Sequence, residues 1–140
     1  MKRRQTRGFT LIETIAAIVI LAMAIPPIFW ALRDGATRRV GALQASQARW
    51  HATDKLEDII ADRHSTTRGY DYVITGNYAA ESPIAGANAF SRTVSISETA
   101  ADLVTVGTGY KTVTVTVSWT DLLGTSNDLA VSTVVTDFQP

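Results

Sequence analysis

The most unusual charged residue in this sequence is Glu13, which stands inside an apolar stretch. It carries the only charge between Phe9 and Leu32, and the run from Ile15 to Leu32 is eighteen uncharged residues long. A charged side chain placed deep in lipid costs about 2.5–3.5 kcal/mol on insertion scales, so such residues usually have a partner and a function. The chemistry offered here is the pairing of a carboxylate with a cation inside a membrane or a helix bundle.

Two other groups of residues have the side-chain types of metal ligands. His51, Asp54, Asp58 and Asp62 share a helix face, but nothing completes a coordination set, and a solvated acidic face is the simpler interpretation. The second group surrounds a turn and could offer oxygen ligands to calcium, although such residues also favour turns for their own sake. It consists of Asp121, Asn127 and Asp128. We predict no metal site and no cofactor.

The sequence shows no arrangement of catalytic residues. It has no Gly-x-Ser-x-Gly motif, no phosphate-binding loop and no cysteine, and His51 and His64 are the only histidines. Thirteen Lys and Arg residues balance thirteen Asp and Glu residues, but four of the basic residues lie in the first eight positions. The remainder is therefore acidic, which gives no reason to expect nucleic-acid binding. We do not expect an enzyme.

The segment that carries Glu13 predicts a membrane-spanning helix. Residues 9–32 would extend roughly 36 Å as a helix, enough to cross a hydrocarbon core of about 30 Å. Trp30, near the end of the run, and Arg33, directly after it, match the aromatic and basic anchors of a membrane interface. The positive-inside rule places the N-terminus in the cytoplasm because of the basic residues before the run. These are Lys2, Arg3, Arg4 and Arg7.

Pro26 and Pro27 interrupt the regular hydrogen bonding of this helix. Because proline has no amide hydrogen, the carbonyls of Ala22 and Met23 lose their usual helical partners. Sharp bends in helices are commonly found at such residues. We therefore predict a kink or a short melted stretch at the proline pair.

The rest of the chain predicts a continuation of this helix, to about Arg63, and then an antiparallel sheet. Apolar residues recur at helical spacing in residues 33–64, most clearly from Ala52 to Ile60. Alternating apolar and hydroxyl residues predict strands at 90–97, 110–120 and 129–138, with a short strand at 71–75 and loops at 76–88 and 121–128. We expect an α+β fold in which the outer half of the helix packs on three or four strands.

The N-terminus resembles the cleavage and methylation motif of type IV pilins and type II secretion pseudopilins. The motif is Arg7-Gly8-Phe9-Thr10-Leu11-Ile12-Glu13: a short basic leader ends in glycine, an aromatic residue follows, and a glutamate lies four residues further on. The resemblance implies that residues 1–8 are a leader and that a prepilin peptidase cuts between Gly8 and Phe9. It also implies methylation of the new amino group of Phe9. The helix-then-sheet layout agrees with it.

The resemblance also implies a partner for Glu13. In pilin-like filaments this carboxylate is thought to pair with the free amino group of Phe9 on a neighbouring subunit and to help set the stagger between subunits. The alternative is that Glu13, near the helix start, reaches the interface or stays protonated. Part of the spanning helix often loses its helical form in such filaments, and Pro26 and Pro27 mark that place. An ordinary proline kink would have the same local geometry.

Differences from the better-known members of this family indicate which of its subgroups this chain resembles. The lack of cysteine excludes the C-terminal disulfide common in major type IV pilins, and no counterpart of the calcium-binding loop of major pseudopilins is evident. The small size and the hairpin sequence at 113–121 resemble a minor pilin or minor pseudopilin, whereas Glu13 argues against the tip-most position. We predict a filament-core helix at 9–32, its amphipathic continuation at 33–64 and an extracytoplasmic sheet region at 65–140.

The predicted function is that of a structural subunit, first anchored by one helix in the inner membrane and then assembled with other pilins or pseudopilins through that helix. Another class is an extracytoplasmic binding module released by ordinary signal peptidase, for which Ala22-Met23-Ala24 offers a cleavage site. Against it stand Glu13 in the apolar core and the long amphipathic helix that would remain. A third class, a single-span anchored domain without a filament role, would make Gly8, Phe9 and Glu13 coincidences.

Overall fold

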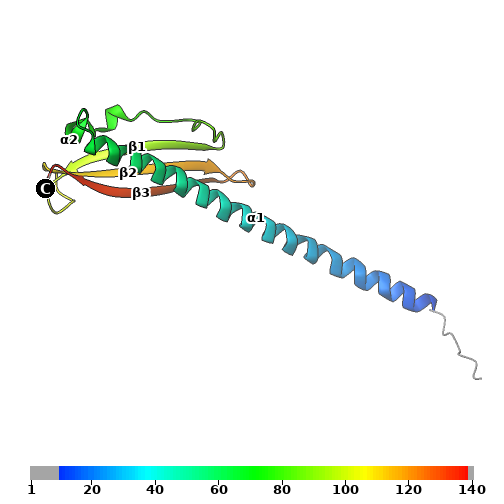
Figure 1. Ribbon diagram of the computed structural model, residues 1–140. Helices are drawn as coiled ribbons and strands as arrows, with labels where there is room; N and C mark the ends of the chain where they lie inside the picture. Colours follow the sequence, from blue (N-terminus) through cyan, green and yellow to red (C-terminus); the bar gives the residue numbers. More distant parts are fainter. Residues whose placement is uncertain (1–9, 139–140) are drawn as a thin grey trace, which may run out of the picture. The chain divides into compact units, whose positions relative to one another are not determined.

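The computed structural model describes residues 10–138 of the chain (Figure 1). The elements are helix α1 (Leu11–His64), short helix α2 (Gly69–Tyr72), the 3-10 turn η1 (Thr75–Asn77), and strands β1 (Phe90–Thr99), β2 (Tyr110–Thr120) and β3 (Ser126–Thr136). The sheet is antiparallel with the order β1-β2-β3, so β2 is its central strand. The predicted α+β architecture is confirmed, with three strands.

The chain divides into two compact units, Met1–Val40 and Gly41–Pro140. The apolar half of α1 belongs to the first unit. The second unit contains the later part of α1 together with the whole sheet, and its hydrophobic core joins these two elements. We describe each unit by itself.

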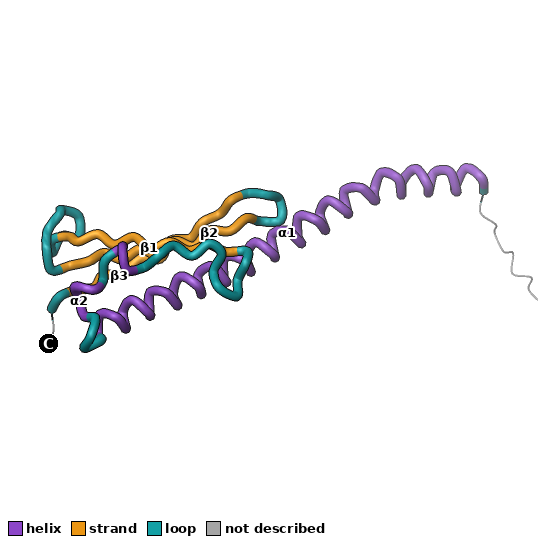
Figure 2. The backbone as a smooth tube through the Cα atoms, turned by 90° about the horizontal axis from the view of Figure 1, so that it is seen from above, coloured by secondary structure: helices purple, strands orange, loops and turns teal. Residues whose placement is uncertain are grey.

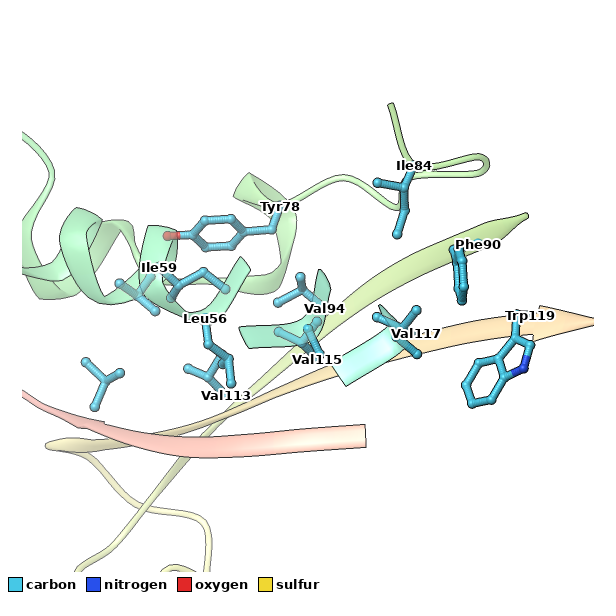
Figure 3. Packing of buried hydrophobic residues seen from close by; sticks show 14 residues of the cluster. Leu56, Ile59, Tyr78, Ile84, Phe90, Val94, Val113, Val115, Val117 and Trp119 are labelled. Atoms are coloured by element: carbon cyan, nitrogen blue, oxygen red, sulfur yellow. The ribbon is translucent and has the colours of Figure 1, made fainter. Parts of the chain in front are cut away.

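The core of the second unit lies between one face of the sheet and the buried stripe of α1. On β2 the side chains of Val113, Val115 and Val117 are fully buried. Because side chains alternate across a strand, valine at every second position places all three on one face. Buried residues of α1 pack against them (Figure 3), and each fully buried aliphatic side chain contributes about 1.5–3 kcal/mol. These helix residues are Ala48, Ala52, Leu56 and Ile59.

The opposite face of β1 and β2 is covered by hydroxyl side chains, and we call it the hydroxyl face. Its residues alternate with the buried ones and are exposed or half-buried. They are Ser91, Thr93, Ser95 and Ser97 on β1 and Thr112, Thr114, Thr116 and Ser118 on β2. The Oγ1 atom of Thr114 lies 2.8 Å from the Oγ atom of Ser132 on β3. None of the eight positions is charged.

The short strand predicted at 71–75 is wrong, because this segment forms α2 and η1 instead. Local hydrogen bonds hold it in a coiled form: the Val73 amide donates to the Tyr70 carbonyl at 3.1 Å, and the Asn77 side-chain amide donates to the Tyr72 carbonyl at 2.7 Å. The segment contacts β1 through a side chain: the Thr75 hydroxyl accepts a hydrogen bond from the Ile96 amide at 2.9 Å. Apolar alternation over five residues does not reveal such bonds.

The connection between β2 and β3 is shorter than the predicted loop at 121–128. Asn127 pairs with Trp119 and Asp128 with Ser118, so both residues belong to β3. The polar character of these residues made them resemble a turn. At the other end β3 stops at Thr136, two residues before the predicted end.

Candidate assembly surface

The start of α1 is capped by a reciprocal pair of hydrogen bonds between Thr10 and Glu13. The Glu13 amide donates to the Thr10 hydroxyl at 3.3 Å, and the Thr10 amide lies 3.5 Å from a carboxylate oxygen of Glu13. This arrangement is a capping box, which satisfies amides that the first helical turn leaves without carbonyl partners. The Thr-x-x-Glu spacing signals it in the sequence, although a helix cap was not among the roles predicted for Glu13. Gly8 and Phe9 lie outside the described residues.

The apolar half of α1 exposes almost all of its large side chains. Between Leu11 and Leu32 their exposed fractions run from 44% at Ile25 to 81% at Leu11. The helix is long and apolar enough to cross a membrane, and none of its most apolar eighteen-residue window is buried. A continuous exposed apolar surface is unusual for a soluble monomer, and it is compatible with lipid or with neighbouring helices.

Within this segment α1 is continuous through Pro26 and Pro27. The single chain therefore does not show a melted stretch at the pair. Loss of helical form within an assembly stays a prediction, as do the processing role of Gly8 and Phe9 and the pairing of Glu13 with an amine.

An ion-pair cluster in the second unit links α1 to β1 and to the segment before β1. This cluster was not predicted from the sequence. Arg92 on β1 is 6% exposed, and its guanidinium donates to both carboxylate oxygens of Glu81 at 2.8 and 3.0 Å. It also donates to the His51 carbonyl at 2.7 Å and to the Asp54 carboxylate at 3.3 Å on α1. Lys55 lies 3.1 Å from Glu81. These contacts join α1, β1 and the connection before β1.

The pKa of Glu81 reflects this environment. Burial acts to raise it, but hydrogen bonds with Arg92 and Lys55 and the charges of both residues outweigh burial and hold the pKa below the ordinary value of 4.5. A carboxylate whose pKa is depressed by folding stabilises the native state above its unfolded pKa. That stabilisation is lost as the pH falls through the folded value.

We expect Glu81→Gln to lower the free energy of unfolding by about 2 kcal/mol at pH 7, since a hydrogen-bonded charge is replaced by a neutral amide. The difference from the unsubstituted chain should shrink as the pH falls below 4.5, where Glu81 itself takes up a proton. Urea unfolding of both chains at pH 7 and at several lower values measures this. A difference that does not change with pH would contradict the proposed contribution of the Glu81 charge.

Three of the acidic residues that have the side-chain types of metal ligands, Asp54, Asp62 and Asp121, have other partners. Asp54 contacts Arg92, and Asp62 pairs with Arg68 and accepts a hydrogen bond from the Tyr78 hydroxyl at 3.1 Å. Burial, together with that hydrogen bond, raises the pKa of Tyr78. Asp121 accepts hydrogen bonds at 2.8 Å from two backbone amides of its own turn. In residues 10–138 no group of three or more His, Asp or Glu side chains is placed to hold a metal ion.

Comparison with known proteins gives one match. Residues 3–25 match the prokaryotic N-terminal methylation motif. No curated protein and no solved structure matches the chain. The matched segment contains the capped start of α1 and most of its exposed apolar surface, and the second unit has the α+β architecture of a pilin. The N-terminal segment of this chain therefore carries the methylation motif of type IV pilin-like precursors.

Proposed function

We propose that this chain is a structural subunit, a minor pilin or minor pseudopilin, of a type IV pilus or a type II secretion-type filament. The observation that carries the proposal is the methylation motif at residues 3–25, which leads directly into a helix whose apolar side chains are exposed. A surface of this kind needs lipid before assembly and neighbouring helices after it. A subunit that moves from membrane to filament meets both needs with the same helix.

The N-terminal segment would work in three steps. Residues 1–8 act as the leader, a prepilin peptidase removes them, and the amino group of Phe9 is methylated. Residues 9–32 then hold the chain in the inner membrane, with the N-terminus in the cytoplasm and residues 65–140 outside. In the filament the helix packs against other pilin-like subunits, and small residues allow close approach. These are Ala16, Ala17, Ala22 and Ala24.

The cation proposed for Glu13 is the amino group of Phe9 on a neighbouring subunit. The capping box shows what Glu13 does in the single chain, where its carboxylate faces the Thr10 amide. Pairing with an amine is compatible with this position, because a carboxylate has two oxygens and accepts several hydrogen bonds. The same side chain can therefore cap its own helix and bind the end of the next one.

The mass of the N-terminal peptide tests the proposal. Protein expressed with a prepilin peptidase and recovered from the membrane is expected to begin at methylated Phe9. A first residue of Ile25 would instead indicate release by ordinary signal peptidase after Ala24. An intact Met1 would indicate a simple membrane anchor, and either result would overturn the proposed processing.

A further inference from the structure

Three arginines follow the apolar run of α1 in close succession. They are Arg33, Arg38 and Arg39, and Asp34 is the single acidic residue in the segment 33–39. α1 continues without interruption from the apolar run into this segment (Figure 2), and the three arginine side chains are exposed. The whole segment belongs to the first unit, so its position relative to the apolar run is fixed by the helix itself.

The three arginines are distributed around the helix and do not form a stripe. Because an α-helix turns by about 100° per residue, Arg38 is rotated by about 140° from Arg33, and Arg39 by about 240°. We call these three residues the arginine ring. A protein partner contacts one side of a helix, so the residues that meet it recur on one face. Positive charge on every side fits surroundings that are the same on every side, such as lipid headgroups at the end of a membrane span.

Only part of the charge of the arginine ring is neutralised within the chain. The Nε atom of Arg38 donates to the Asp34 carboxylate at 2.9 Å, and the two side chains are 80% and 63% exposed. Such an exposed pair is weak and exchanges readily with other anions. Within residues 10–138, neither Arg33 nor Arg39 forms an ion pair. The segment therefore keeps a net positive charge that an external anion can neutralise.

The arginine ring has the depth of the headgroups when residues 9–32 span a membrane. The headgroup region adds about 5–7 Å on each side of the hydrocarbon core. At about 1.5 Å per residue, Arg33 follows Leu32 by roughly 1.5 Å and Arg39 by roughly 10.5 Å. Side chains on a helix tilt toward its N-terminus, which here means toward the membrane, so the long side chains of Arg38 and Arg39 return to the headgroup level.

The charge of the arginine ring is opposite to that of the chain that follows it. From Val40 to Pro140 the sequence has six Lys and Arg residues against eleven Asp and Glu residues, so this part is formally five charges negative. Basic residues are less common on the outer side of membrane proteins than on the cytoplasmic side. Their concentration directly after the span suits a partner at the membrane surface, because attraction between charges in salt reaches only about 8–10 Å.

We propose that the arginine ring binds the headgroups of anionic phospholipids in the outer leaflet of the membrane that anchors the chain. A guanidinium group stays charged at physiological pH and pairs with a phosphate group through two parallel hydrogen bonds. The bound lipids set the depth of the helix in the membrane. The inference rests on the membrane-anchored stage of the proposed function, and it adds the class of lipid that surrounds the helix at that stage.

Quenching of Trp30 fluorescence tests the inference, because this tryptophan lies three residues before Arg33 and is 74% exposed. The full chain is reconstituted in vesicles of equal parts phosphatidylglycerol and phosphatidylcholine, with bromine on the acyl chains of one lipid or of the other. Bromine quenches only tryptophans that touch the acyl chains, so the ratio of the two quenching levels gives the relative affinity for the two lipids. Phosphatidylglycerol is expected to bind about fivefold more tightly or better, since one arginine near an anionic surface contributes about fivefold.

The triple variant Arg33→Gln, Arg38→Gln and Arg39→Gln should abolish this preference, and the matched control is Arg49→Gln. Arg49 is exposed on the same helix ten residues after Arg39, so its substitution should leave the preference unchanged.

The outcomes separate this inference from the proposed function. Equal quenching by the two brominated lipids, or a preference that the triple variant keeps, would overturn the inference and leave the membrane anchor intact. Loss of filament entry by the triple variant, in a chain without any lipid preference, would assign the arginine ring to a protein partner and overturn the inference as well. If neither brominated lipid quenches Trp30, the helix does not lie in the bilayer, and the proposed anchoring falls together with the inference.

Discussion

Glu13→Gln is expected to leave cleavage and methylation of the precursor intact while stopping the chain from entering filaments. Glutamine keeps the capping box, since Gln serves as well as Glu at the third position of that motif. It removes the charge that is proposed to pair with the amino group of Phe9 on the neighbouring subunit. An unpaired charge in the membrane costs about 2.5–3.5 kcal/mol, so about tenfold less chain, or lower, should appear in the sheared filament fraction.

Two further variants separate the charge from the cap. Thr10→Ala removes the capping hydroxyl but keeps the Glu13 carboxylate, so it should cost helix stability of about 1 kcal/mol and still assemble. Glu13→Ala removes both and should fail to assemble as Glu13→Gln does. Peptide mass at the N-terminus checks processing in each case. Normal assembly of the glutamine variant, with failure of Thr10→Ala, would show that Glu13 acts as a helix cap and not as an ion-pair partner.

Arg92→Met should have the largest effect on the stability of the sheet domain. The substitution fills much of the same space but leaves Glu81 and Asp54 without the guanidinium that they share. Removing one member of a buried ion pair usually costs about 3–5 kcal/mol. We expect about 3 kcal/mol, because Lys55 still contacts Glu81 and the side chain of Asp54 is half exposed. Urea unfolding followed by tryptophan fluorescence at neutral pH measures it.

The matched control is Arg49→Met, an exposed arginine on α1. It should change the free energy of unfolding by no more than about 0.5 kcal/mol. The double variant Arg92→Met with Glu81→Gln should cost less than the sum of the two single variants, since both remove the same contact. If Arg92→Met and Arg49→Met lowered the free energy of unfolding equally, the ion-pair cluster would not stabilise the packing of α1 on β1.

The fold was predictable where one physical signal dominated. Strict alternation of valine with threonine predicted β2 over Tyr110–Thr120, because a strand with one buried face needs an apolar residue at every second position. The apolar stripe from Ala52 to Ile60 likewise identified the helix that covers the sheet. The strand predicted at 71–75 was wrong, because side-chain hydrogen bonds, including that of the Thr75 hydroxyl, stabilise a different conformation of this segment.

The parts of the site that depend on distant partners could not be predicted. Arg92 lies between Phe90 and Val94 in the alternation of β1, at a position that faces the core. The sequence shows that a charged residue is unusual there, but it does not show which residue pairs with it. That partner, Glu81, comes from a loop whose composition gives no sign of an ion pair. Such contacts depend on the tertiary structure, which brings together residues far apart in the sequence.

The hydroxyl face of β1 and β2 has a consequence for how the outer side of the sheet responds to its surroundings. Serine and threonine hydroxyls do not titrate in the physiological range, and none of the eight positions carries charge. Ionic strength weakens attraction between charges and leaves contacts between neutral hydroxyls nearly unchanged. The eight hydroxyl positions therefore offer the same chemistry in acid, in alkali and at high salt, and the charge on this side of the sheet comes from β3, where Asp128 lies directly opposite Ser118.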